Sequence, residues 1–144
     1  MPDFSKYGIT TDILYALLFI AFLLVILWFL NKPPAPPFSN DRLHGKVRFV
    51  VDGDSLFING HKPQIRLWGV DAPEKRDSGY AAATKTLNRI AFNNNISCQV
   101  VETDRYGRTV ARCFLNDGQE INALMIASGT ATEYRRFTKG FYSR

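Results

Sequence analysis

The sequence predicts an α+β domain that is preceded by one transmembrane helix. An unbroken apolar run covers residues 13–30. Farther along, apolar residues alternate on either side of Asp52-Gly53 and Asn59-Gly60, the dipeptides most typical of two-residue hairpin turns. A later stretch that ends near Phe92 has apolar residues at helical spacing. Hairpins followed by a helix, on roughly a hundred residues, indicate one domain that can bury its own core.

The charge balance of the chain points to an acidic partner. The 144 residues carry a net charge of +5. Residues 41–144 contain 16 Lys and Arg against 11 Asp and Glu, so the basic excess lies in the domain. Such a balance favours a polyanion such as nucleic acid, because basic surfaces attract phosphates. The alternative is that the charge serves only solubility.

The apolar run has the length and the borders of a membrane span. Its eighteen residues cover ~27 Å as a helix, close to the hydrocarbon thickness of a bilayer. Tyr15 and Trp28 lie near its ends, where amphipathic rings favour the membrane interface. A cleaved signal peptide is the alternative, but its apolar region is usually ~7–15 residues long and precedes a small-x-small site. We therefore expect residues 13–30 to be an uncleaved anchor in the lipid bilayer.

Two short segments flank this anchor. Residues 1–12 form an N-terminal tail, and residues 31–40 form a Pro-rich linker that we expect to be a semi-rigid stalk. The signals for membrane orientation conflict. Lys6 precedes the run whereas Lys32 and several arginines follow it, so positive-inside counting favours a cytoplasmic domain. The cysteines described below favour the opposite side.

A three-stranded antiparallel meander is predicted for residues 47–51, 54–58 and 64–68. The first turn and the end of the third strand can lie at the same end of such a sheet, which brings Asp54 close to Asp71. Two carboxylates there can share a hard cation through their oxygens. The alternative is that these acids are ordinary turn residues, which are common beside glycine.

The segment from Arg66 to Glu74 begins as a strand and ends as a loop that carries two acids. Gly69 and Pro73 interrupt regular structure, because glycine tolerates unusual dihedral angles and proline fixes its own. Asp71 and Glu74 therefore lie on a constrained loop. An arginine followed by two carboxylates suggests phosphate chemistry, because the acids can hold a divalent cation or activate water while the guanidinium binds phosphate oxygens.

The remaining residues are predicted to form a helix, a second hairpin and a shorter helix. These elements are a helix capped by Asp77 and Ser78 that runs to Phe92, strands 96–103 and 109–115, and a helix over 123–128 capped by Asn122. Gly107 supplies the turn of the hairpin, and Arg108 follows it. The basic and aromatic tail, residues 134–139, is either a phosphate-binding edge or an exposed end.

Cys98 and Cys113 are the only cysteines of the chain. A hairpin that turns about residues 105–106 places them directly opposite each other on one face, at a spacing that small shifts adapt to a disulfide. Two buried thiols are the alternative. A disulfide would imply an oxidising compartment.

Three segments together, VVDGDSL (50–56), RLWGVDAPE (66–74) and TDRYGRTVA (103–111), resemble the staphylococcal nuclease (thermonuclease) family. The resemblance covers nearly all of residues 45–134 and is greatest to exported bacterial members. It implies a five-stranded OB-like β-barrel with packed helices. It also implies a calcium-dependent phosphodiesterase that acts on DNA and RNA and leaves 3′-phosphate ends.

The resemblance implies a role for each motif residue. Calcium would be held by Asp54 and Asp71 and by the backbone carbonyl of Ala72, all oxygen ligands of the kind that Ca²⁺ prefers. The catalytic side chains would be Glu74 as general base, with Arg66 and Arg108 binding the phosphate and stabilising its charge in the transition state.

The chain departs from the family pattern in several places. Ser55 and Ala72 each replace a threonine, and the loop over residues 75–80 is shorter, so substrate access is expected to differ. The sequence stops at Arg144, about where the family's C-terminal helix would begin, so residues 41–144 would lack most of that helix. We expect this domain to be weakly stable alone, or a partner or a membrane surface to compensate.

Two other functions are weighed beside the membrane-anchored nuclease. One is a non-catalytic OB-type module that binds nucleic acid or protein at the membrane, since such barrels often bind strands without chemistry. The other is a membrane scaffold whose barrel only docks a partner. For location, the anchor and the cysteines together predict a single-pass protein of a bacterial inner membrane with its domain in the periplasm.

Overall fold

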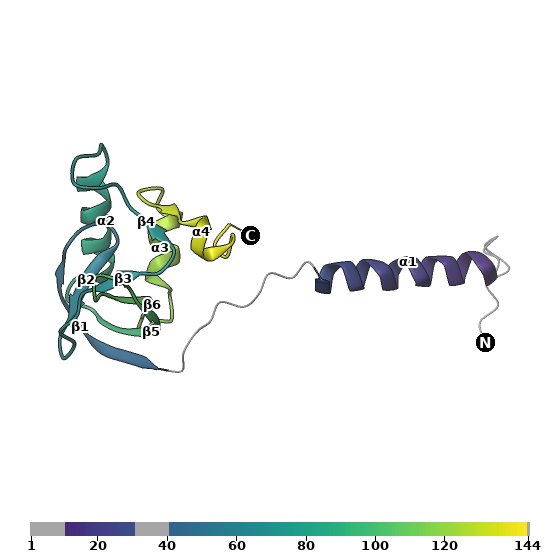
Figure 1. Ribbon diagram of the computed structural model, residues 1–144, viewed down its shortest axis with the longest axis horizontal. Coiled ribbons are helices and arrows are strands. Elements are labelled where there is room, and N and C mark those ends of the chain that lie inside the picture. Colours follow the sequence, from purple (N-terminus) through teal and green to yellow (C-terminus); the bar gives the residue numbers. More distant parts are fainter. Residues whose placement is uncertain (1–10, 31–40, 144) are drawn as a thin grey trace. The chain divides into compact units, whose positions relative to one another are not determined.

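The computed structural model describes residues 11–30 and 41–143, and it divides the chain into two units, Met1–Ala35 and Pro36–Arg144 (Figure 1). The first unit contains one helix, α1 (Thr11–Leu30). Its described side chains, those of residues 13–27, are apolar and almost all exposed. Over the described residues 11–30 and 41–143, no helix has both the length and the hydropathy needed to cross a membrane. The predicted linker, residues 31–40, and nearly all of the predicted tail lie outside the described residues.

A closed five-stranded barrel forms the centre of the second unit, as the sequence predicts. Its strands are β1 (Arg42–Val50), β2 (Ser55–Ile58), β3 (Ile65–Leu67), β5 (Asn95–Thr103) and β6 (Thr109–Leu115), in the order β1-β2-β3-β6-β5. The meander of the first three strands and the hairpin of the last two are antiparallel, as predicted. The barrel closes through a parallel pairing of β3 with β6 and an antiparallel pairing of β1 with β5.

A separate two-stranded sheet holds the segment after β3. In it β4 (Val70–Asp71) pairs with β7 (Thr132–Glu133), and Asp71 lies opposite Thr132. The prediction that Asp71 lies on a constrained loop past the strand end was therefore wrong at this residue, which belongs to a strand. The partner strand is far away in the sequence, so local pattern gives no sign of the pairing.

Both predicted helix caps are wrong, although the helices exist. Helix α2 (Tyr80–Ala91) begins after Gly79, whose φ of 98° is left-handed and favours glycine. The carboxylate of Asp77 instead accepts a hydrogen bond from the backbone N–H of Glu74. Helix α3 (Ile121–Ala127) begins after Glu120, so Asn122 lies inside it, and the chain ends with a short helix, α4 (Arg135–Thr138).

The side chain of Asn122 connects β6 to the residue that follows β3, instead of capping a helix. It is fully buried, donates to the carbonyls of Trp68 and Ala111, and accepts a hydrogen bond from the N–H of Cys113. These backbone groups lie at the junction of β3, β6 and α3. A buried amide can satisfy donors and acceptors at once, which explains why this polar residue stands in the core.

Cys98 and Cys113 are opposite each other on β5 and β6 and form a disulfide, the first of the two alternatives that the sequence left open. The predicted register holds from Ile96, opposite Leu115, to Val100, opposite Ala111. A bulge then shifts it by one residue before the turn.

The core of the second unit lies inside the barrel and between the barrel and helices α2 and α3. Its largest fully buried side chains include Leu56, Ile65, Leu87, Ile121 and Met125. Burying one such side chain stabilises the fold by ~1.5–3 kcal/mol. The core thereby fixes the strand ends and turns that carry the candidate site.

Candidate functional site

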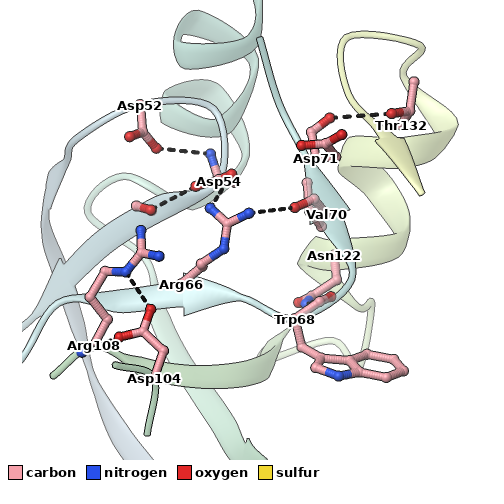
Figure 2. A network of polar contacts seen from close by, with 11 residues as sticks. Asp52, Asp54, Arg66, Trp68, Val70, Asp71, Asp104, Arg108, Asn122 and Thr132 are labelled. Carbon is pink, nitrogen blue, oxygen red and sulfur yellow. Dashed lines mark hydrogen bonds and ion pairs between the residues drawn. The ribbon is translucent and has the colours of Figure 1, made fainter. Parts of the chain in front are cut away.

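An ion pair between neighbouring strands lies at the centre of the site. Arg66, the middle residue of β3, donates from Nη1 to Oδ2 of Asp54 at 2.5 Å and from Nη2 to the carbonyl of Val70 at 3.3 Å. Figure 2 shows its guanidinium between these two acceptors. The Asp54 side chain is 8% exposed and the Arg66 side chain 22%. The pair is therefore shielded on the carboxylate side and reaches solvent on the guanidinium side.

A second carboxylate lies beside this pair. Oδ1 of Asp52 accepts a hydrogen bond from the backbone N–H of Asp54, and Oδ1 of Asp54 accepts one from the hydroxyl of Ser55. Partial burial and the charge of Asp54 raise the pKa of Asp52 above its ordinary value. The turn before β2 therefore concentrates carboxylate oxygens, and Arg66 is the cation bound to one of these carboxylates, that of Asp54.

Arg108 is held by the turn that precedes β6. Its Nε donates to Oδ2 of Asp104 at 2.7 Å, and the Oδ1 of Asp104 accepts the backbone N–H groups of Tyr106 and Arg108. Burial opposes ionisation of Asp104, but the hydrogen bonds and the charge of Arg108 lower its pKa below the ordinary value. An aspartate that caps its own turn in this way fixes the start of the following strand and the arginine on it.

Aromatic and basic side chains extend this turn outward. The Tyr106 ring is 67% exposed and lies under two guanidiniums, with the Cζ of Arg105 and of Arg108 at 4.7 and 5.4 Å from its centroid. Arg105 also donates to the Tyr106 hydroxyl at 2.6 Å. Cations stacked on an exposed ring suit a partner with phosphates and flat bases.

One surface hollow of ≈ 870 Å³ brings three of the predicted residues together. Arg66, Glu74 and Arg108 all line it. The lining also includes residues with no predicted catalytic or metal-binding role, among them Glu102, Asp104, Tyr106, Tyr134, Arg136 and Phe137. The last three belong to the basic and aromatic tail, which therefore forms an edge of the hollow. Asp104 is a partner that the Asp-Arg-Tyr-Gly turn sequence could have indicated.

Glu74 is exposed and lies on the loop between β4 and α2. Its backbone N–H and carbonyl both bind Asp77, which accepts through its carboxylate and donates through its own N–H. This closed turn fixes the backbone of Glu74 while leaving its carboxylate in solvent. Glu74 also lines a second hollow, of ≈ 430 Å³, together with Asp71 and Ala72.

The predicted calcium ligands are only partly brought together. Asp71 and Ala72 share the second hollow, whereas Asp54 is buried and contacts the first hollow through Arg66. Within residues 11–30 and 41–143, no group of three or more His, Cys, Asp or Glu side chains could hold a metal ion. The predicted calcium site has only two carboxylates and one carbonyl. It stays a prediction, as do the predicted roles of Arg66, Glu74 and Arg108.

Part of the chain matches a known protein family, and about two thirds of it matches individual curated proteins. Residues 64–143 match the family model described as "Staphylococcal nuclease homologue". An "Uncharacterized endonuclease" of Escherichia coli O157:H7 is 29% identical over 97 residues, which cover 66% of this chain and 63% of that protein. The "Micrococcal nuclease" of Shigella flexneri is 31% identical over 105 residues, covering 66% and 60%. An "Uncharacterized endonuclease" of Haemophilus influenzae is 33% identical over 103 residues, covering 69% and 57%.

The chain spans a little under two thirds of the length of these curated relatives. The family model covers β3 and everything after it up to residue 143. The matched region therefore contains the candidate site residues Arg66, Asp71, Glu74 and Arg108 and the tail residues that form an edge of the hollow. Asp54 lies before it.

Proposed function

The chain belongs to the staphylococcal nuclease family, and on this premise we propose that it is a nuclease that hydrolyses phosphodiester bonds of DNA and RNA. The observation that carries the proposal is that Arg66, Glu74 and Arg108 line one hollow. Two guanidiniums and one carboxylate are the groups that such hydrolysis requires, because the phosphate gains negative charge and water must lose a proton.

In this proposal Arg66 and Arg108 bind the phosphate. A guanidinium has five N–H donors in a planar fork. The contacts of Arg66 with Asp54 and Val70 use two of its nitrogens, and the contact of Arg108 with Asp104 uses its Nε. These contacts orient each guanidinium, and the N–H groups that they do not use serve the phosphate. Preorganised donors of this kind stabilise the charge that develops in the transition state.

Glu74 is the general base in this proposal. Its carboxylate would accept a proton from the attacking water, whose oxygen forms the new bond to phosphorus. The bond from phosphorus to the 5′ oxygen then breaks, and that oxygen takes up a proton from solvent water while Glu74 releases its proton to solvent. The products are a 3′-phosphate and a 5′-hydroxyl. The closed turn with Asp77 supports this role, because a general base must be held within reach of the water.

Calcium is part of the proposal, with the carboxylates of Asp54 and Asp71 and the carbonyl of Ala72 as its ligands. The donor set fits the ion, because Ca²⁺ prefers carboxylate and carbonyl oxygens. The carboxylates that crowd the turn before β2, where burial and Asp54 raise the pKa of Asp52, also favour a cation there. A bound calcium ion would supply positive charge for the phosphate oxygens.

We further propose that residues 13–30 anchor the protein in the inner membrane, with the domain in the periplasm. Helix α1 supports the anchor, since its described side chains are apolar and almost all exposed. The disulfide between Cys98 and Cys113 supports an oxidising compartment. Alkylation of both cysteines in protein from its native host, without prior reduction, would contradict this location.

The test of the nuclease is digestion of plasmid DNA and single-stranded RNA by the full chain, with calcium and with chelator. We expect calcium-dependent cleavage and a ~10²–10⁴-fold loss of kcat in Glu74→Gln, the usual effect of removing a general base. Glu102→Gln is the matched control, because Glu102 is also an exposed glutamate that lines the hollow. It should retain activity within a few-fold.

A second candidate function is a non-catalytic module that binds nucleic acid. The observation in its favour is that both arginines already bind a carboxylate, Asp54 or Asp104. Calcium-independent binding of single strands, together with no cleavage by the unaltered chain, would select this function over the nuclease.

A further inference from the structure

Residues 133–143, which start at the last residue of β7 and include α4, form a segment that we call the strap. Its middle residues Tyr134, Arg136 and Phe137 line the hollow that Arg66 and Arg108 share. Phe137 is 55% exposed, and its ring stacks edge-on with that of Tyr134 at 4.9 Å. The strap is therefore one wall of the hollow. In the sequence it comes after all three motifs that carry the proposed chemistry.

Glu133 closes the strap on itself. Its side chain is 4% exposed. One carboxylate oxygen accepts the hydroxyl of Thr138 at 2.5 Å and the N–H of Tyr142 at 2.9 Å, and the other accepts the hydroxyl of Ser143. The beginning and the end of the strap are thus joined by one buried carboxylate.

A second carboxylate fastens the strap to the barrel. The carboxylate of Glu120, just before α3, accepts hydrogen bonds from both Nε and Nη2 of Arg112 on β6, at 2.8 and 2.5 Å. Its Oε1 also accepts the hydroxyl of Tyr142 at 2.5 Å. Burial and the Glu120 carboxylate raise the pKa of Tyr142 well above its ordinary value, so the hydroxyl stays a donor. Tyr142 is the strap residue in this network.

Contacts between aromatic rings connect the network of Arg112, Glu120 and Tyr142 to the hollow. The guanidinium of Arg112 lies over the rings of Phe114 and Phe141, at 5.3 and 4.8 Å from their centroids. The rings of Phe141 and Tyr142 then pack on Trp68, at 5.6 and 5.9 Å. Trp68 lines the hollow two residues after Arg66.

The strap also approaches the backbone after β3 as closely as a glycine allows. A Cβ built on Gly69 would lie 2.4 Å from Thr138 and 3.1 Å from Tyr142, and the carbonyl of Gly69 accepts the N–H of Tyr134 at 2.9 Å. A small displacement of Tyr142 would therefore move the strap relative to the strand that carries Arg66.

We propose that Glu120, held between Arg112 and Tyr142, is a positioning residue that fixes the strap as the substrate wall of the hollow, so that Tyr134, Arg136 and Phe137 contact single-stranded nucleic acid. The inference rests on the proposed function only for its substrate class. It adds a role to three residues, Arg112, Glu120 and Tyr142, that lie outside the hollow and touch no substrate.

The experiment measures substrate binding and turnover of the full chain in detergent. Tyr142→Phe removes only the hydroxyl that joins the strap to Glu120. We expect the KM for a single-stranded oligonucleotide to rise about five-fold with kcat within two-fold, since a hydrogen bond to a charged group is lost but no reacting group is. The Kd for a fluorescein-labelled single-stranded oligonucleotide in chelator should rise by the same factor. Tyr80→Phe is the matched control, because it removes a hydroxyl that bonds Val51 at 3.4 Å outside the hollow.

A second variant tests the wall without touching the network. Phe137→Ala should raise KM and Kd at least as much as Tyr142→Phe with an unchanged Tm, and the double variant should add little, because both changes act on one wall. Unchanged Kd in either variant, or an equal change in Tyr80→Phe, would overturn the inference. Absence of cleavage by the unaltered chain with the same pattern of Kd values would instead refute only the nuclease. Absence of any oligonucleotide binding would refute both.

Discussion

Asp54 and Arg66 form an ion pair of 2.5 Å across two neighbouring strands, with the carboxylate buried and the guanidinium facing the hollow. The register places Ser55 opposite Arg66, so the pair is a diagonal contact of the β2–β3 hairpin. The pair couples the stability of the barrel to the candidate site, because the residue proposed to bind phosphate is also the partner of a buried acid.

Arg66→Ala is expected to destabilise the protein by about 2–3 kcal/mol, because it leaves the Asp54 carboxylate buried without its cation. Urea unfolding of the domain signal measures this. The double variant Asp54→Ala/Arg66→Ala is the control, since neither charge then stays unpaired. A double variant as unstable as the sum of the two single variants would show that the two side chains are not coupled.

The Asp104–Arg108 turn predicts a dependence of stability on pH. The folded-state pKa of Asp104 is lowered from its ordinary 3.8, so its contribution is fully present above that value and is lost as pH falls through the folded pKa. Asp104→Asn keeps an acceptor oxygen but removes the charge. The difference in Tm between the unaltered protein and this variant should be constant at neutral pH and shrink below pH 3.8. A difference that grows on acidification would contradict the assignment.

The hairpins, whose turns depend on residues that are close together in the sequence, were predicted correctly from local pattern. Asp52-Gly53 and Asn59-Gly60 predicted the meander because each turn depends on its own residues. The closure of the barrel between β3 and β6, and the pairing of Asp71 with Thr132, join segments that are far apart in the sequence. Asp77 was expected to cap a helix and binds Glu74 instead, because a short polar side chain fits both kinds of turn.

That Arg66 and Arg108 belong to one site was predicted by the family resemblance and not by their spacing in the sequence. Nothing in the separation of Arg66 from Arg108 shows that the β3–β6 pairing brings them to one hollow. The partners that orient them differ in how visible they are. Asp104 lies in the same turn as its arginine, whereas Asp54 reaches Arg66 only after the hairpin forms.

Asn122→Ala is expected to destabilise the protein by about 3 kcal/mol, because it removes the buried amide that bonds the Trp68 carbonyl and the Cys113 N–H. The Ala111 carbonyl loses one donor but keeps the N–H of Trp68. Thermal or urea unfolding measures the change. Asn116→Ala is the matched control, since Asn116 is exposed in the turn after β6. A loss below 1 kcal/mol for Asn122→Ala would mean that water replaces the amide, which its full burial argues against.

The Cys98–Cys113 disulfide closes a separation of 15 residues, which includes the turn that carries Asp104 and Arg108. Because a cross-link of this length restricts the unfolded chain, its reduction should lower the free energy of unfolding by ~3 kcal/mol. The measurement is urea unfolding with and without reductant, and the control is Cys98→Ala/Cys113→Ala, whose stability the reductant should not change. The two cysteines pair across strands that stay hydrogen-bonded to each other on both sides of the link. Reduced protein should therefore keep the barrel and the hollow, and retain oligonucleotide binding at temperatures where it stays folded. Loss of binding in reduced but folded protein would show instead that the link also fixes the turn that holds Arg108.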